Sequence, residues 1–368
     1  MRRLVVALLF GATACATLAG CDPDLPEGTP NATPQVTVLF SPGGVGDRGY
    51  NDQILRGVLQ AEKEGGFDLR ILMPSSPGEA ERLFTDWLDG REGKSSSAGP
   101  SGKSAGKSGS SGGKGGSANN TPGPNNTPGD LFILAGNDYE PMALEHLTAR
   151  PSGGREVLLF ETRAQNLPAT TFSITMYGAC YLAGCAAVAL ADSATVVCGN
   201  STDTVVREGA DGFVDGFTAN GGAGADIRYL ADTWVGYASP ELAYALAAEL
   251  ADSTPYIFPI AGGSNQGIYR YTRENPGRIH TAGMDTEQSD FSTGITFSVV
   301  KHIDRLMADY IGEWVTEGTL PPSRVYGMES GYIDVVPAPG YTDICGPIIE
   351  SRRGEAIAKE MDHEKSHT

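Results

Sequence analysis

Residues 35–65 read QVTVLFSPGGVGDRGYNDQILRGVLQAEKEG, and this stretch contains one complete strand–loop–helix unit. Its first six residues are mostly apolar, which predicts a buried strand. The glycines that follow let the backbone turn tightly. Apolar residues then recur at helical spacing in Ile54, Val58 and Ala61, which predicts an amphipathic helix. A strand that leads through a loop into a helix is the building unit of parallel sheets.

The same unit repeats along most of the chain. Further helical patterns occur at 77–90, 140–149, 181–191, 205–219 and 239–252. They alternate with apolar segments at 68–74, 130–136, 155–161, 170–176, 195–199, 226–232, 254–262 and 277–283. Such alternation predicts an α/β protein with parallel strands and helices on both faces of each sheet. Because these strands are too many for one sheet of ordinary size, we expect two sheets in two lobes.

The amino-terminal segment predicts export and lipid attachment. A basic start, MRR, precedes the apolar run LVVALLFGATACATLAG and then Cys21. This run is too short and too rich in small residues to favour a permanent membrane span. The sequence LAGC at 18–21 resembles the lipobox of bacterial lipoproteins, which implies a lipid on Cys21 and removal of the signal peptide 1–20. The alternative is an ordinary secretory signal. Residues 21–34, rich in Pro and Thr, then form an extended tether.

These features predict a protein of the bacterial cell envelope, anchored to a membrane through the lipid and facing the periplasm or the cell exterior. Beyond the signal, no apolar stretch reaches the length of about 18 residues that a membrane-spanning helix needs. The formal net charge of −18 argues against a nucleic-acid partner, because binding phosphates requires a basic surface.

One segment interrupts the alternation. Residues 93–129 contain no strongly apolar residue and no acid, but they carry four lysines among many Gly and Ser residues. This composition is typical of a flexible insertion. The insertion joins a predicted helix to the following strand, so it should leave from the amino ends of the strands. Ligands bind at the opposite, carboxyl ends.

Four cysteines follow the tether: Cys180, Cys185, Cys198 and Cys345. In an exported protein they admit two disulfides with three alternative pairings, or four buried thiols. A bond between Cys180 and Cys185 is the least suited pairing, because five residues along one helix turn the side chains to different faces. No CxxC spacing or paired His indicates a metal site, and we expect no cofactor.

The loops that follow the predicted strands supply the candidate binding residues. In a parallel sheet these loops share one edge, where ligands bind. They are 41–53, 136–141, 233–241 and 261–267, together with the residues after the strand that ends near Asp285. Aromatic side chains offer stacking area, and a few polar groups fix orientation. The candidates are Ser41, Tyr50, Asn51, Asn137, Asp138, Trp234, Tyr237, Gly262, Gly263, Asp285 and Lys301.

Two of these candidates have alternative interpretations. Asp138 could instead cap the helix that begins near Glu140. Lys301 could be a solvated surface cation, but we expect it near the start of a helix capped by Ser298, where the helix dipole disfavours a cation. A local rule broken in this way favours a functional role for Lys301.

Six motifs in order resemble one known family. They are GGVGDRGYND at 43–52, YLAGCAAVAL at 181–190, GFVDGF at 212–217, IAGGSNQG at 260–267, AGMDTEQ at 282–288 and FSVVK at 297–301. Over residues 36–320, apart from the insertion, the chain resembles the basic membrane protein family. These are lipoproteins that serve as substrate-binding subunits of ABC importers, and several are purine-nucleoside receptors. The resemblance implies a type I periplasmic binding fold, with two Rossmann-like lobes, three crossovers and a ligand cleft between the lobes.

The resemblance also implies roles for individual residues. Asp285 and Lys301 match the positions that hold the ribose, and Tyr50 matches the aromatic that stacks on the base. Tyr237, or Trp234 in a shifted register, matches a second aromatic. A further base contact falls on Asn137 or Asp138. Ser41 departs from the family pattern, because family members commonly carry an Asp there, and this weakens the purine assignment.

We expect lobe 1 to comprise 35–165 and 286–320, lobe 2 to comprise 166–285 and 321–348, and residues 349–368 to form a polar tail or short helix. The function expected is that of a monomeric ABC-importer receptor for a nucleoside-like small molecule, with permease and ATPase subunits as partners. A ligand sensor or surface adhesin is an alternative. A nucleoside hydrolase is less well supported, because it would need paired carboxylates or an acidic metal cluster, whereas Asp47, Asp138 and Asp285 are scattered in the sequence.

Overall fold

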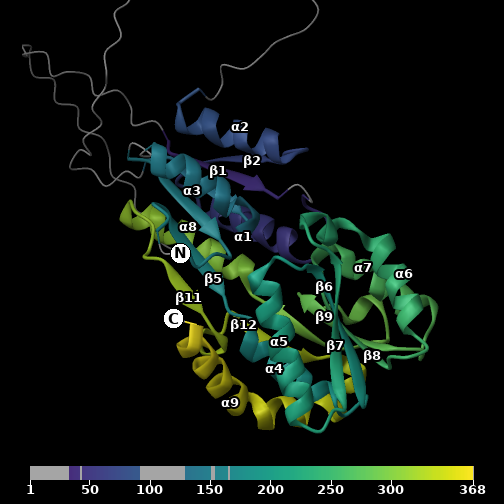
Figure 1. Ribbon diagram of the computed structural model, residues 1–368. Helices are drawn as coiled ribbons and strands as arrows, with labels where there is room; N and C mark the ends of the chain where they lie inside the picture. Colours follow the sequence, from purple (N-terminus) through teal and green to yellow (C-terminus); the bar gives the residue numbers. More distant parts are fainter. Residues whose placement is uncertain (1–32, 42–43, 92–128, 151–153, 165, 368) are drawn as a thin grey trace, which may run out of the picture. The chain divides into compact units, whose positions relative to one another are not determined.

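The computed structural model describes residues 33–41, 44–91, 129–150, 154–164 and 166–367 (Figure 1). The predicted signal peptide, the lipid site at Cys21, most of the tether and nearly all of the 93–129 insertion therefore lie outside the described residues. Within the described part, no helix has both the length and the apolar character needed to cross a membrane.

The first sheet has the strand order β11-β5-β4-β3-β1-β2, and all of its strand pairs are parallel. Its strands are β1 (Gln35–Phe40), β2 (Asp68–Leu72), β3 (Leu131–Ala135), β4 (Glu156–Phe160), β5 (Thr170–Ile174) and β11 (Arg324–Tyr326). Helices α1 (Tyr50–Glu64) and α8 (Ile303–Glu317) pack together on one face. Helices α2 (Pro77–Leu88) and α3 (Glu140–Ala149) cover the other face with Phe84, Trp87 and Leu147.

The second sheet repeats this arrangement, with the order β12-β10-β9-β8-β6-β7. Its strands are β6 (Ser193–Asn200), β7 (Gly224–Ala231), β8 (Tyr256–Ile260), β9 (His280–Asp285), β10 (Ile295–Lys301) and β12 (Ile333–Pro337). Only the pair of β10 with β12 is antiparallel among the described pairs. The helices α4 (Tyr177–Ala187), α5 (Thr204–Ala219) and α9 (Thr342–His367) pack on one face, and α6 (Pro240–Leu250) and α7 (Asn265–Glu274) on the other (Figure 1).

Short 3₁₀ helices follow several strands and carry site residues. They are η1 (Asn137–Tyr139), η2 (Trp234–Ala238), η3 (Gly262–Ser264), η4 (Ser289–Phe291), η5 (Met328–Ser330) and η6 (Pro339–Tyr341). Two sheets of mostly parallel strands, each covered by helices on both faces, confirm the predicted α/β class. The chain passes between the sheets three times, from β5 to α4, from β10 to α8 and from β11 to β12, as expected.

The sheets divide the chain differently from the expected lobe boundaries. Strand β5 pairs with β4 in the first sheet, although we assigned 166–285 to lobe 2. Strand β10 pairs with β9 in the second sheet, although we assigned 286–320 to lobe 1. Strand β11 pairs with β5, although we assigned 321–348 to lobe 2. The physical reason is that a strand joins whichever sheet offers it an open edge, and its own sequence does not specify that edge.

One local prediction at the carboxyl-terminal side was wrong, and a second is met only in part. Residues 297–301 belong to strand β10, so Ser298 caps no helix and α8 begins only at Ile303. Residues 349–367, for which we expected a tail or a short helix, are helical, but they belong to the longer, 26-residue helix α9. Cys345, Ile349 and Ala356 bury one side of α9 in the core, which explains why the helix is ordered despite its polar composition.

The four cysteines are all buried free thiols, so the two-disulfide alternative is not present in the structure. Cys180 and Cys185 lie on α4, which is buried along its whole length. Burial raises the pKa of the Cys185 thiol to about 12 and that of Cys345 to about 11. These thiols therefore behave as small apolar core residues.

Candidate ligand-binding site

The loops after the strands of both sheets meet around Tyr50, the first residue of α1. Its ring stacks on Phe160, with a centroid distance of 5.1 Å and an interplanar angle of 17°. Burial raises the pKa of Tyr50, and four carboxylates act in the same direction: Glu161, Asp138, Asp285 and Asp203. Two of these acids come from each lobe. Tyr50 therefore marks a junction where acids from both lobes converge.

Ser41 and Asp138 hold one side of this junction together. Ser41 follows β1, and its hydroxyl donates to Asp138 Oδ1 at 2.9 Å. Burial raises the pKa of Asp138 to about 6, although the hydrogen bond from Ser41 opposes the rise. Ser41 thus contacts an acid supplied by a neighbouring loop.

Asn51 is held by Asp47 at the start of α1. The carboxylate of Asp47 accepts the backbone N–H groups of Gly49, Asn51 and Asp52 and also Asn51 Nδ2 at 3.1 Å. Asn51 Oδ1 is buried and has no hydrogen-bond partner among the described residues. It is therefore an unused acceptor beside Tyr50.

Asp203 was missed in the sequence, although it contacts two predicted residues. It is the N-cap of α5, where its Oδ1 accepts the Val205 N–H at 2.9 Å. It also accepts Asn137 Nδ2 at 3.2 Å and the hydroxyl of Tyr237 at 2.7 Å. Since Asn137 lies in the first lobe, Asp203 bridges the lobes. It lies in the loop after β6, so the rule that identified the other loops would also have found it.

Tyr237, rather than Trp234, is the inner aromatic residue of the second lobe. Its ring lies so close to Gly199 that a Cβ there would come within 2.5 Å of it, and it also contacts Gly262. Trp234 packs 5.5 Å from Tyr237 but is 40% exposed. Gly262 has a φ of +52°, which suits glycine, and Gly263 lies beside Asp47 of the first lobe. Gly262 therefore leaves room for the Tyr237 ring, and Gly263 lets the two lobes approach closely.

Lys301 forms a buried ion pair, and its partner, Glu161, is absent from the candidates named from the sequence. Its Nζ lies 3.1 Å from Glu161 Oε2, and both side chains are almost fully buried. No hydrogen bond joins Lys301 to Asp285 among the described contacts. The two residues nevertheless interact: burial lowers the pKa of Lys301, but the carboxylates of Glu161 and Asp285 outweigh burial and raise it. Glu161 ends the predicted strand 155–161, and its position there was the signal that we overlooked.

Glu161 and Asp285 occupy equivalent positions in the two sheets. Glu161 directly follows β4, Asp285 ends β9, and these strands hold the same place in the two strand orders. Both residues have left-handed backbone, with φ of +60° and +66°. Non-glycine residues in this conformation are strained by about 1 kcal/mol or more and concentrate at functional sites. Burial raises the pKa of Asp285 to about 6, with Lys301 opposing the rise.

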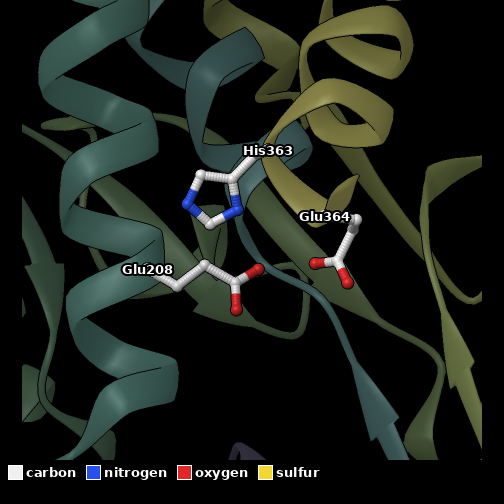
Figure 2. A group of neighbouring side chains, drawn as sticks. All are labelled: Glu208, His363 and Glu364. Atoms are coloured by element: carbon white, nitrogen blue, oxygen red, sulfur yellow. The ribbon is translucent and has the colours of Figure 1, made fainter. Parts of the chain in front are cut away.

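A second polar cluster lies at the first crossover and contains Glu208, His363 and Glu364 (Figure 2). These three side chains are close enough to suggest a metal site. However, Arg163 donates to Glu208 Oε2 at 3.0 Å and to Glu364 Oε1 at 3.0 Å. The backbone of α4 uses the other oxygen of Glu208, since Met176 N donates to Oε1 at 3.0 Å. Arg163 thus already pairs with both carboxylates, and these contacts account for the cluster without a metal ion.

Comparison with known proteins supports the fold. No family model matches the chain, and no curated protein matches it. Solved structures do. The chain is similar to an ABC transporter solute-binding protein from Aeropyrum pernix K1, with 17% identity, a TM-score of 0.66 and coverage of 90% of this chain and 86% of that one.

Two further solved structures show the same likeness. A solute-binding protein from Conexibacter woesei DSM 14684 gives 14% identity, a TM-score of 0.57 and coverage of 91% and 97%. One from Burkholderia graminis C4D1M, in complex with D-arabinose, gives 11% identity, a TM-score of 0.54 and coverage of 84% of this chain and 96% of that one. The fold is therefore that of the type I periplasmic binding proteins, as predicted. At these identities the likeness extends to the fold alone.

Proposed function

We propose that this protein is the solute-binding component of an ABC importer, and that it captures a nucleoside-like small molecule between its two lobes. The observation that carries the proposal is the buried group of Glu161, Lys301 and Asp285 at the carboxyl edges of both sheets. Two of its members have strained backbones. Burying three ionised groups costs free energy unless they serve a purpose that packing alone does not provide.

The proposed ligand lies against residues from both lobes. A flat ring stacks on Tyr50 of the first lobe and on Tyr237 of the second. Hydroxyl groups of a sugar donate to the carboxylate of Asp285 and to Asn51 Oδ1, and Lys301 donates to a sugar oxygen. This set keeps the roles that the resemblance to the basic membrane protein family implies. It adds Glu161 and Asp203 as the groups that orient Lys301 and Tyr237.

Ligand entry requires separation of the lobes. The described contacts between them include Asn137 with Asp203 at 3.2 Å and Gln53 Nε2 with the Asp285 carbonyl at 2.7 Å. The guanidinium of Arg48 lies 4.8 Å from the ring centroid of Phe291. These contacts are polar, so their groups can bond to water instead when the lobes separate. Opening at the three crossovers admits the ligand, and closing buries it.

The remaining parts of the proposal rest on the sequence. The LAGC motif at 18–21 supports a lipid on Cys21, which would hold the receptor at a membrane of the bacterial envelope beside its permease and ATPase subunits. The similar solved structures include ABC transporter solute-binding proteins, which supports a transporter partner.

Calorimetric titration with inosine and adenosine tests this function, together with mass spectrometry of small molecules released from the purified protein. Lys301→Ala should weaken binding by at least tenfold, because it strands Glu161 in the binding site. The exposed residue Lys359 offers a matched control, and Lys359→Ala should bind as tightly as wild type. If neither nucleoside binds and no small molecule is released, the proposal fails.

A further inference from the structure

The charges around Tyr50 do not balance. The carboxylates of Asp138, Glu161, Asp203 and Asp285 all act on its hydroxyl. Lys301 is the one cation in the described structure that acts on both Glu161 and Asp285. The junction therefore contains more negative than positive charge before any ligand arrives.

Two of the acids already have their compensation. Glu161 is paired with Lys301 at 3.1 Å. Asp203 lies at the amino end of α5, where the helix dipole favours an anion, and it accepts hydrogen bonds from Tyr237 and Asn137. These two carboxylates therefore already have hydrogen-bond partners within the protein.

Asp285 is different. It is only 8% exposed, yet its carboxylate accepts no hydrogen bond from the residues that the structure describes. Asp138 receives a side-chain hydrogen bond from the neutral hydroxyl of Ser41 and faces the further negative charge of Asp203. Asn51 Oδ1 is a third acceptor at this junction, buried and without a partner among the described residues. The groups that lack either a hydrogen-bond donor or a balancing positive charge are thus all acceptors, and two of them, Asp285 and Asp138, are anionic.

We propose that the ligand of this site carries a protonated amine, seated against the carboxylate of Asp285. This inference rests on the proposed solute-binding function and narrows its substrate class. An ammonium group supplies three donors and one positive charge, which meets both deficits at once. A phosphate or carboxylate group would add repulsion to acids that are already uncompensated. The formal net charge of −18 further favours the approach of a cation.

Matched nucleosides test the inference. Adenosine, its 2′-, 3′- and 5′-amino-deoxy analogues and adenosine 5′-monophosphate share one ring system and differ in charge. By titration calorimetry at pH 7.5, at least one amino analogue should bind tenfold or more tightly than adenosine, and the monophosphate should bind more weakly than adenosine. The inference is overturned if adenosine or the monophosphate binds as tightly as every amino analogue.

A variant of Asp285 and a pair of sugars distinguish failure of this inference from failure of the nucleoside assignment. Asp285→Asn should reduce the preference for the amino analogue by about tenfold, whereas Asp226→Asn, at an exposed position of β7, should leave it unchanged. Glucosamine and glucose form an independent pair. If no nucleoside binds but glucosamine binds tenfold more tightly than glucose, the nucleoside assignment fails and the inference stands. If no compound in either set binds, both fail.

Discussion

Asp285→Asn should stabilise the protein without ligand while impairing its function. The carboxylate of Asp285 is buried at the lobe junction, where it accepts no hydrogen bond from the described residues. Asparagine has nearly the same shape but no charge, and it tolerates the left-handed backbone of this position, with φ of +66°. The substitution therefore removes an electrostatic cost without adding backbone strain.

The size of the effect follows from the pKa. Burial raises the pKa of Asp285 from an ordinary value of 3.8 to about 6, against the opposing charge of Lys301 and with Asp47 and Glu161 adding to the rise. About two pKa units, at about 1.36 kcal/mol each, correspond to about 3 kcal/mol. Because the folded state holds this proton more tightly than the unfolded state does, the stability from Asp285 is full at low pH and is lost as the pH rises through about 6.

Urea denaturation at pH 8 and at pH 4.5 measures this difference. At pH 8 the variant should exceed wild type by about 2 to 3 kcal/mol in unfolding free energy, and the gap should shrink by at least half at pH 4.5. Asp226→Asn, on the exposed face of β7, is the control and should match wild type at both values. Equal urea midpoints for wild type and Asp285→Asn at pH 8 would refute the argument that this carboxylate is buried without compensation.

Three other predictions concern the buried ion pair, the cysteines and the 93–129 segment. Glu161→Gln should cost about 3 kcal/mol of stability in urea denaturation, because it leaves Lys301 buried without its partner; an unchanged midpoint would contradict this. A variant lacking residues 1–21 should expose four thiols to Ellman's reagent when it is unfolded without reductant. If no thiol reacts, the cysteines form disulfides and the prediction is wrong. Deleting 93–129 should leave ligand affinity within tenfold of wild type, since closure entropy varies slowly with loop length. A larger loss of affinity would mean that this segment contributes to the binding site.

The sequence was sufficient to predict the class of fold. Strands in parallel sheets are buried on both faces, so β3 and β8 are continuous apolar runs and β1 and β4 are mostly apolar, and they alternate clearly with amphipathic helices. The rule that ligands lie at strand carboxyl ends brought most of the candidates to one junction. Asp203 and Glu161 were omitted because the rule was not applied to the loops after β6 and β4.

Other features depend on pairing that a local pattern does not encode. The run FSVVK suits a strand or a helix start, and only the hydrogen bonds of β10 with β9 and β12 decide between them. The partner of Lys301 is Glu161, which is 140 residues away in the chain. A carboxylate much nearer in sequence, Asp285, was the obvious alternative. Which acid pairs with the lysine is decided by how the two lobes meet.

Native mass spectrometry of the purified protein, followed by titration of any small molecule that it releases, tests solute binding at the lobe junction most directly. We predict one small molecule per chain, and at least a 30-fold loss of affinity for it in Asp285→Ala, corresponding to about 2 kcal/mol. Lys359→Ala should bind it as wild type does. A released molecule that binds Asp285→Ala and wild type equally tightly would contradict the account, because the site would then lie elsewhere.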